Sequence, residues 1–233
     1  VPDVMGEDQV IGADEPTIAV GAETFAPTQV GGCTEVAGTF AEGAISDCTT
    51  ITFVIKAATF APGAYPVVVT NPKPADCRSM EPVDLTVAPP PALVAIAPDL
   101  VCSAQGDQTM TITGSGFLAV GAEKPTVKLG AQSLGAATVD RCTPVAAPSQ
   151  RAFAEGEVST CTSLTFVVPM GALAAGDHAV SVVNPLPADC TSEETVTLHV
   201  AAPPVIAGLA PPSVCDAQGD QPLTIDGTGF LVV

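Results

Sequence analysis

The stretch CSAQGDQTMTITGSGFLAV, residues 102–120, decides the architecture of the chain because it occurs twice. It returns as CDAQGDQPLTIDGTGFLVV at residues 215–233, so that the two copies begin 113 residues apart. Self-similarity at a fixed interval of this size is the signature of a repeated structural unit. The rest of each unit is therefore expected between and before the two copies.

Further matches define the limits of the units. Residues 17–25 match residues 126–134 at a shift of 109, and residues 63–72 match residues 176–185 at a shift of 113. The change in shift indicates that the loop after Cys142 is longer than its counterpart, as surface loops tolerate. The matches predict one complete unit, the later part of another and the first strand pair of a third, at residues 91–201, 1–88 and 204–233. One unit is thus expected to be split between the two ends of the sequence.

The segments inside each unit are typical of β-strands. CTTITFVI at residues 48–55 and CTSLTFVV at residues 161–168 are rich in β-branched residues. Such runs are short, are separated by turns drawn from 21 Gly and 23 Pro, and show no helical period. This pattern predicts an all-β chain of sandwich domains, and the prolines at residues 89–91 and 203–204 predict stiff links between them.

A family resemblance follows from the opening of each unit. VAIAP at residues 94–98 followed by TITGSGF at 111–117, and VIAGLAP at 205–211 followed by TIDGTGF at 224–230, resemble the start of an IPT/TIG domain. These domains are immunoglobulin-like sandwiches of the plexin and transcription-factor type, also common in bacterial surface proteins. The resemblance covers nearly the whole chain and implies tandem immunoglobulin-like domains with a binding or spacing role. The four cysteines of each repeat and the long loop 143–160 depart from the family pattern.

Charge and composition exclude several kinds of partner. The net charge is −18 and only seven residues are Lys or Arg, so no basic face for nucleic acid or for an anionic membrane surface can form. No segment approaches the about 20 consecutive apolar residues that a membrane-spanning helix needs. Eight cysteines without metal-type Cys-x-x-Cys pairs predict disulfides and an oxidising compartment, either extracellular or at the cell surface.

The resemblance guides the pairing of the cysteines. In an immunoglobulin-like sandwich Cys142 would end one strand and Cys161 would begin the next at the same end, which predicts Cys142–Cys161 and, by repetition, Cys33–Cys48. Elimination then leaves Cys102–Cys190, although the turns that carry these two residues should lie at opposite ends.

An alternative remains open for the cysteines outside the two predicted pairs. Cys102 and Cys190 would instead form bridges between successive domains or subunits, with Cys77 and Cys215 as partners. A zinc site is disfavoured because the cysteine spacings are wide and no His repeats with them.

Carboxylates in loops are the only candidate cation ligands. Asp107 and Asp220 lie in equivalent turns, and Asp8, Asp14 and Glu15 lie in an acidic N-terminal loop. Calcium prefers several oxygen ligands, so one carboxylate per turn makes a weak calcium candidate. No cofactor is expected.

No constellation for catalysis is evident. His178 and His199 are the only imidazoles, and they correspond to Tyr65 and Thr86 in the other repeat, so neither belongs to the repeated pattern. Both are expected to be exposed strand residues. Catalysis requires a nucleophile, a base and an orienting group within reach of one another, and none is predicted, so the chain is not expected to be an enzyme.

Three functional hypotheses follow. The first is a structural subunit or segment of an extracellular filament or stalk of disulfide-bonded repeats, which either belongs to a longer array, closes on itself or assembles head to tail with copies of itself by strand exchange. The second is a cell-surface adhesin, or a carbohydrate- or protein-binding module, whose unknown ligand binds loops such as 143–160, with Phe40 and Phe153 as aromatic candidates. The third is an accessory region of an enzyme.

Overall fold

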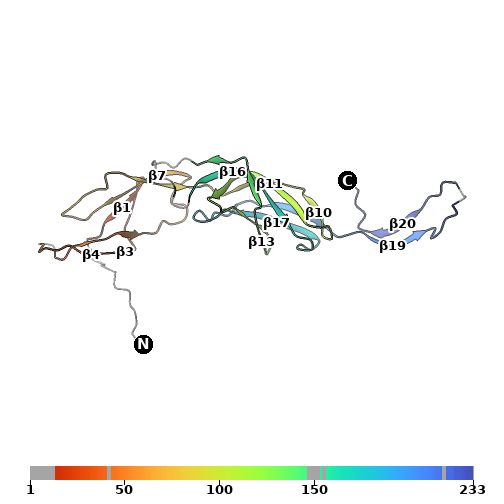
Figure 1. Ribbon diagram of the computed structural model, residues 1–233, viewed down its shortest axis with the longest axis horizontal. Helices are drawn as coiled ribbons and strands as arrows, with labels where there is room; N and C mark the ends of the chain where they lie inside the picture. The colour runs from red at the N-terminus through yellow and green to blue at the C-terminus, as the bar shows by residue number, and fades with distance from the viewer. Residues whose placement is uncertain (1–13, 41–42, 146–152, 154–155, 217–218, 233) are drawn as a thin grey trace, which may run out of the picture. The chain divides into compact units, whose positions relative to one another are not determined.

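The computed structural model describes residues 14–40, 43–145, 153, 156–216 and 219–232 (Figure 1). The described residues form β-strands and contain no α-helix, which confirms the all-β class. Accordingly, this part of the chain contains no helix of the length and apolarity required to cross a membrane. The described residues divide into two compact units, residues 14–88 and residues 89–232; below, unit 1 is the first of these and unit 2 is the sandwich of the second, residues 89–201.

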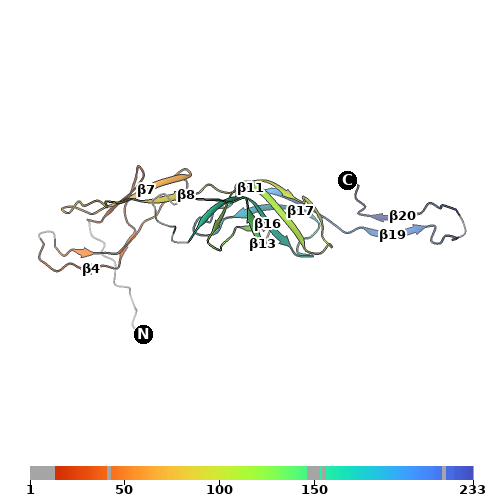
Figure 2. The ribbon, with the colours of Figure 1, turned by 45° about the horizontal axis from the view of Figure 1, so that its top comes forward.

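Unit 2 contains two sheets that pack as two layers (Figures 1 and 2). The strands of the first sheet are, in order, β10 (Leu100–Cys102), β18 (Val196–Ala201), β17 (Gly176–Val183), β12 (Thr126–Leu129) and β13 (Gln132–Gly135). The strands of the second are β14 (Thr138–Asp140), β16 (Val158–Val168), β11 (Gln108–Val120) and β9 (Ala92–Ala97), with β15 (Thr143–Pro144) also pairing with β16. The arrangement is a β-sandwich.

The core of this sandwich lies between the two sheets. Alternate residues of β11 and β16 point inward, as the period of two in a strand requires. The fully buried members of the core are Met110, Ile112, Phe117, Val127, Cys161, Leu164, Phe166, Val180, Val182 and Leu198. Burying each large apolar side chain contributes about 1.5–3 kcal/mol, so β11 is a main source of the stability of unit 2.

The glycines of the repeated stretch produce a bulge inside β11. The pairing of β11 with β16 shifts between Thr113 and Phe117, and a Cβ atom on Gly114 would collide with the carbonyl oxygen of Ala92. Gly116 has a φ of +73°, which favours glycine. The structure thus places the bulge in the middle of a strand of 13 residues.

Unit 1 is built from smaller sheets. Its four-stranded sheet has the order β2 (Glu23–Phe25), β1 (Thr17–Val20), β7 (Gly63–Thr70) and β8 (Val83–Val87), with β7 and β8 visible side by side in Figure 2. Two further strand pairs are β3 (Gln29–Gly31) with β6 (Thr50–Thr52), and β4 (Thr34–Glu35) with β5 (Ser46–Asp47).

The strand registers of unit 1 repeat those of unit 2. Ile18 pairs with Val69 as Val127 pairs with Val182. The β3–β6 pair repeats β14–β16 in the same way, because Val30 pairs with Ile51 as Val139 pairs with Leu164. Among the residues that the structure describes, however, unit 1 has no counterpart of β9, β10 and β11, so the outer edges of β6 and β8 have no neighbouring strand. Unit 1 therefore has the strands of an incomplete sandwich.

The last strands of the chain form a two-stranded hairpin of β19 (Val205–Ala210) and β20 (Thr224–Thr228), drawn in blue in Figure 1. Leu209 pairs with Ile225 as Ile96 pairs with Ile112 in β9–β11. The bulge recurs as well, and a Cβ atom on Gly227 would collide with the carbonyl oxygen of Val205. The hairpin thus already has the geometry of the strand pair that unit 1 lacks.

The structure contains the disulfides Cys33–Cys48 and Cys142–Cys161, and it leaves Cys77, Cys102, Cys190 and Cys215 as free thiols among the described residues. The predicted bridge Cys102–Cys190 is therefore wrong. Strand β10 runs parallel to β18 and places Cys102 beside Ala201, at the end of β18, whereas Cys190 precedes the start of β18. The length of β18, at about 3.3 Å per residue, separates them by roughly 17 Å, which exceeds the about 7 Å that a disulfide can span between Cα atoms.

Candidate functional site

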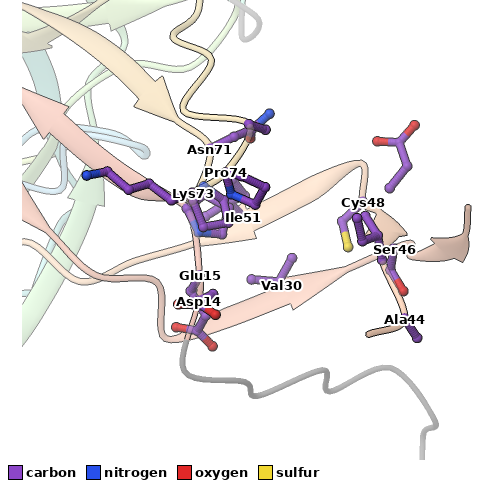
Figure 3. A pocket seen from close by; sticks show the side chains of 15 residues that line it. Asp14, Glu15, Val30, Ala44, Ser46, Cys48, Ile51, Asn71, Lys73 and Pro74 are labelled. Carbon is purple, nitrogen blue, oxygen red and sulfur yellow. The ribbon is translucent and has the colours of Figure 1, made fainter. Parts of the chain in front are cut away.

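An open cavity of about 500 Å³ lies in unit 1 beside β6, at an edge where the described residues supply no counterpart of β11 (Figure 3). Val30 on β3 and Ile51 on β6 belong to its apolar lining, and Cys48 also lines it. Asn71, Lys73 and Pro74, from the segment after β7, lie on one side, and Asp14 and Glu15 lie on another. The cavity thus combines apolar strand residues with a polar rim.

The apolar residues at this edge are only partly covered. Ile51, Phe53 and Ile55 are half-buried, whereas their counterparts on β16, which has β11 as its neighbouring strand, are buried. The tilted contacts of Phe53 with Phe25 and of Phe60 with Tyr65, at 5.5 and 4.7 Å between ring centroids, fill part of the interior of unit 1. Sequence reasoning missed this aromatic cluster, although the cluster holds four of the few aromatic residues of the chain. The aromatic side chains do not cover the outer edge of β6.

Asn184 shows what the missing strand does in a complete unit. Its side chain is 1% exposed and bonds twice to β11, because Leu118 N donates to Oδ1 and Nδ2 donates to the carbonyl oxygen of Gly116, both at 2.9 Å. A buried amide must be satisfied in this way. Asn184 therefore holds the strand of the repeated stretch in its place across the sandwich.

The equivalent residue in unit 1 is Asn71, which is exposed and lines the cavity. At the shift of 113 residues its two partners would be Gly229 and Leu231, which follow β20. The sequence analysis assigned no role to either asparagine. The internal repeat could have indicated this contact, because it aligns Asn71 with Asn184 and Gly229 with Gly116.

Replacing Asn184 with alanine is expected to lower the free energy of unfolding of the chain by about 2–3 kcal/mol, because it leaves Leu118 N buried without an acceptor. Asn71→Ala is the matched control, and it should leave the stability of dilute chain nearly unchanged, since Asn71 is exposed. Urea unfolding followed by circular dichroism measures both. Equal losses for the two variants would contradict the assigned role of Asn184.

The hairpin β19–β20 exposes the side chains that a complete unit buries. Leu223, Ile225 and Phe230 are 53%, 51% and 51% exposed, whereas their counterparts Met110, Ile112 and Phe117 are fully buried. Leu209 and Ile206 are likewise exposed. A contiguous group of exposed apolar side chains of this kind marks an interaction surface.

The weak calcium candidates do not come together. Asp107 Oδ1 accepts a hydrogen bond from Met170 N at 3.0 Å, so this carboxylate fixes a turn. Asp220 is exposed, and Asp14 and Glu15 lie at the rim of the cavity. Asp8 lies outside the described residues. Among the residues placed by the structure, no three His, Cys, Asp or Glu side chains form a group suited to a metal ion.

The histidines lie on the first sheet of unit 2. His199 is exposed on β18 and its Nδ1 lies 2.7 Å from Asp177 Oδ1, across the β17–β18 pair. His178 is half-buried rather than exposed, and its Nε2 lies 2.8 Å from the carbonyl oxygen of Ala174. These contacts tie each imidazole to a local partner.

The two loop phenylalanines proposed for ligand binding, Phe40 and Phe153, are both half-buried. They therefore present little aromatic surface. The hairpin β19–β20, by contrast, exposes several large apolar side chains.

Comparisons with known proteins add little to this geometry. No family model and no curated protein matches the chain. Among solved structures it is similar to the Bacteroides ovatus mixed-linkage glucan utilization locus protein SGBP-B, solved in complex with a mixed-linkage heptasaccharide, at 13% identity and a TM-score of 0.28. The match covers 82% of this chain and 40% of that one. We base neither the fold nor the function on a similarity at this level.

Proposed function

We propose that the chain is a non-catalytic structural subunit of an extracellular filament or stalk, built from tandem immunoglobulin-like sandwiches of the IPT/TIG type. In this proposal the hairpin β19–β20 of one copy completes the incomplete sandwich of unit 1 in the next copy. One observation carries the proposal: the hairpin has the register and bulge of the β9–β11 pair, which has no counterpart among the described residues of unit 1.

Unit 2 defines the pairing that the two copies would form. Ile112 pairs with Leu164 and Met110 with Phe166 between β11 and β16. The equivalent residues, 113 positions later for β11 and 113 positions earlier for β16, give the pairs between copies. Ile225 of one copy pairs with Ile51 of the next, and Leu223 pairs with Phe53. Phe230 then lies beside Cys48 in the cavity, because Phe117 pairs with Cys161. Asn71 bonds to Gly229 and Leu231 as Asn184 bonds to Gly116 and Leu118.

The energetic terms favour this pairing. Adding a strand to the open edge of β6 supplies backbone hydrogen bonds, and the alternating side chains supply specificity. Leu223, Ile225 and Phe230 are each about half exposed in the hairpin, so completing their burial contributes roughly 1 kcal/mol for each of them. Covering the β6 edge also removes an unpaired strand edge that would otherwise promote irregular aggregation.

The assembly would be open rather than closed. The donating hairpin and the accepting edge are different surfaces of the same chain, so the interface is heterologous and each new copy leaves one hairpin and one edge free. Tandem sandwiches joined in this way form an extended chain of units stabilised by their neighbours. The two disulfides and the net charge of −18 suit a soluble filament in an oxidising, extracellular environment.

The native mass of the chain tests this function. The variant to use has serine at the four free cysteines, so that the two disulfides remain and only non-covalent association is measured. Sedimentation over a range of concentrations should show a series of oligomers that lengthens as the concentration rises. A 23.2 kDa monomer at all concentrations would contradict the proposal, and so would a dimer that does not grow.

A further inference from the structure

Two of the four free thiols, Cys102 and Cys190, lie near the links that leave and enter unit 2. Cys102 lies beside Ala201, and Ser103 N donates to the carbonyl oxygen of Ala201 at 2.9 Å. Ala201 is the last residue of β18 and begins the proline-containing link that leads to β19. Cys102 therefore marks the end of unit 2 from which the chain continues into the next repeat.

Cys190 marks the opposite end of the same unit. Asn184 N donates to the carbonyl oxygen of Cys190 at 2.9 Å, and the Asn184 side chain bonds to Gly116. Gly116 lies against the backbone of Pro89, Pro90 and Pro91, which form the link that enters unit 2. Cys190 is thus joined to the entering link through a short chain of contacts.

Cys77 repeats the environment of Cys190. Asn71 N donates to the carbonyl oxygen of Cys77 at 2.8 Å, and each thiol donates to a carbonyl oxygen two residues earlier, at 3.3 Å. The preceding turn is the same in both repeats, because Asp76 and Asp189 have positive φ angles of 48° and 46°. Unit 1 therefore presents Cys77 in the geometry that a complete unit gives to Cys190.

In the proposed assembly these ends meet at the link 201–204. Gly229 lies against Pro203 and Pro204, and it is the residue that Asn71 of the next copy would bind. Cys77 of the next copy then lies near Pro203, while Cys102 lies beside Ala201. Ala201 and Pro203 are two residues apart, and two residues of extended chain span at most about 7 Å. Both thiols therefore lie close to the same short link.

The same argument applies to the link 88–91. Cys215 corresponds to Cys102, and Ala88 corresponds to Ala201, so the completed sandwich places Cys215 of the donating copy beside Ala88 of the accepting copy. Cys190 of the accepting copy lies at the other side of that link. Each link is therefore flanked by one thiol from each of two copies.

Resting on the proposed function, we infer that adjacent copies are joined by two disulfides, Cys102 of one copy with Cys77 of the next, and Cys215 of the first with Cys190 of the next. Each bond forms by thiol–disulfide exchange with a small-molecule disulfide such as oxidised glutathione. One S–S bond forms between the cysteines, the S–S bond of the oxidant breaks, and two electrons and two protons end on two glutathione thiols.

Oxidation of the intact chain tests the pairing. The chain is equilibrated with reduced and oxidised glutathione, alkylated, and separated by denaturing electrophoresis without reductant. The expected result is a ladder of multiples of 23.2 kDa, with proteolytic peptides that join Cys77 to Cys102 and Cys190 to Cys215. Peptides that join Cys102 to Cys190, or four alkylated thiols, would overturn the inference.

Two paired variants sharpen the test. Cys102→Ser with Cys215→Ser removes one partner from each bond and should reduce the ladder to the single chain. The matched control, Cys102→Ser with Cys77→Ser, removes both partners of one bond and should keep the ladder through Cys215–Cys190. A ladder that persists in the first variant, or disappears in the control, would overturn the pairing.

The native mass of the variant with four serines separates this inference from the proposed function. If that variant forms oligomers while the oxidised wild-type chain gives no linked peptides, the disulfide inference is wrong and strand exchange stands. If it is monomeric at every concentration and the wild-type chain gives no ladder, both are overturned.

Discussion

Replacing Phe230 with aspartate is expected to abolish association between copies of the chain. Phe230 is half exposed in the hairpin, and its counterpart Phe117 is fully buried. Truncating a buried phenylalanine costs about 3–5 kcal/mol, and the variant would in addition bury an unpaired carboxylate. Association should therefore weaken by at least about 100-fold. Sedimentation of the variant with four serines, with and without Phe230→Asp, measures the effect.

The control for this variant lies on the same hairpin. Ala207 is exposed on β19, and its counterpart Val94 is 75% exposed in unit 2, so position 207 faces outward in a completed sandwich. Ala207→Asp carries the same added charge and should leave association unchanged within about threefold, since surface substitutions have small effects. An equal loss of affinity between copies in the two variants would mean that the added charge weakens association wherever it lies on the hairpin. That result would contradict a specific role for the inward face of the hairpin.

Mixing two variants that cannot assemble alone is expected to produce a defined dimer. Phe230→Asp blocks the donating hairpin but leaves the cavity intact, whereas Ile51→Asp blocks the accepting edge but leaves the hairpin intact. Each variant alone should be monomeric. Together they should form a complex of one copy of each, about twice the 23.2 kDa mass of the chain, which cannot extend because both remaining surfaces are blocked.

The unmixed variant with four serines distinguishes exchange between copies from closure of the chain on itself. A chain that folds its own hairpin onto its own unit 1 would be monomeric at every concentration, whereas exchange between copies gives oligomers. Native mass spectrometry reads the stoichiometry directly, and an equimolar mixture that remains at the monomer mass would contradict exchange between copies. Phe230→Asp alone, at the total protein concentration of the mixture, serves as the negative control and should remain monomeric.

Much of the architecture could be predicted from the sequence because the signals are local. The β-branched runs, the glycine and proline turns and the lack of a helical period predict an all-β chain, as found. The repeat also predicted which stretches correspond, and the matched registers of β3–β6 and β14–β16 follow it. The strands follow from side-chain patterns within a few residues, and the matched registers follow from direct comparison of the repeated stretches.

The features that the sequence did not predict depend on contacts between distant residues. The role of Asn184 depends on Leu118, which is 66 residues away, so the Asn-Pro dipeptide by itself shows only the end of a strand. The bridge Cys102–Cys190 was wrong because elimination within one repeat took precedence over the expected separation of the two turns, which the parallel pairing of β10 with β18 bears out. The position of the bulge inside β11 likewise depends on the continuation of pairing to Val120.

The most direct test of strand exchange is a disulfide placed across the proposed strand pair. Thr111 pairs with Thr165 in unit 2, which predicts that Thr224 of one copy lies opposite Thr52 of the next. In the variant with four serines, Thr52→Cys and Thr224→Cys together should form covalent chains of copies on mild oxidation. The register-shifted pair, Val54→Cys with Thr224→Cys, should form few, because diagonal positions are about 7–8 Å apart. A bond within single chains, or equal bonding of both pairs, would contradict the proposed exchange.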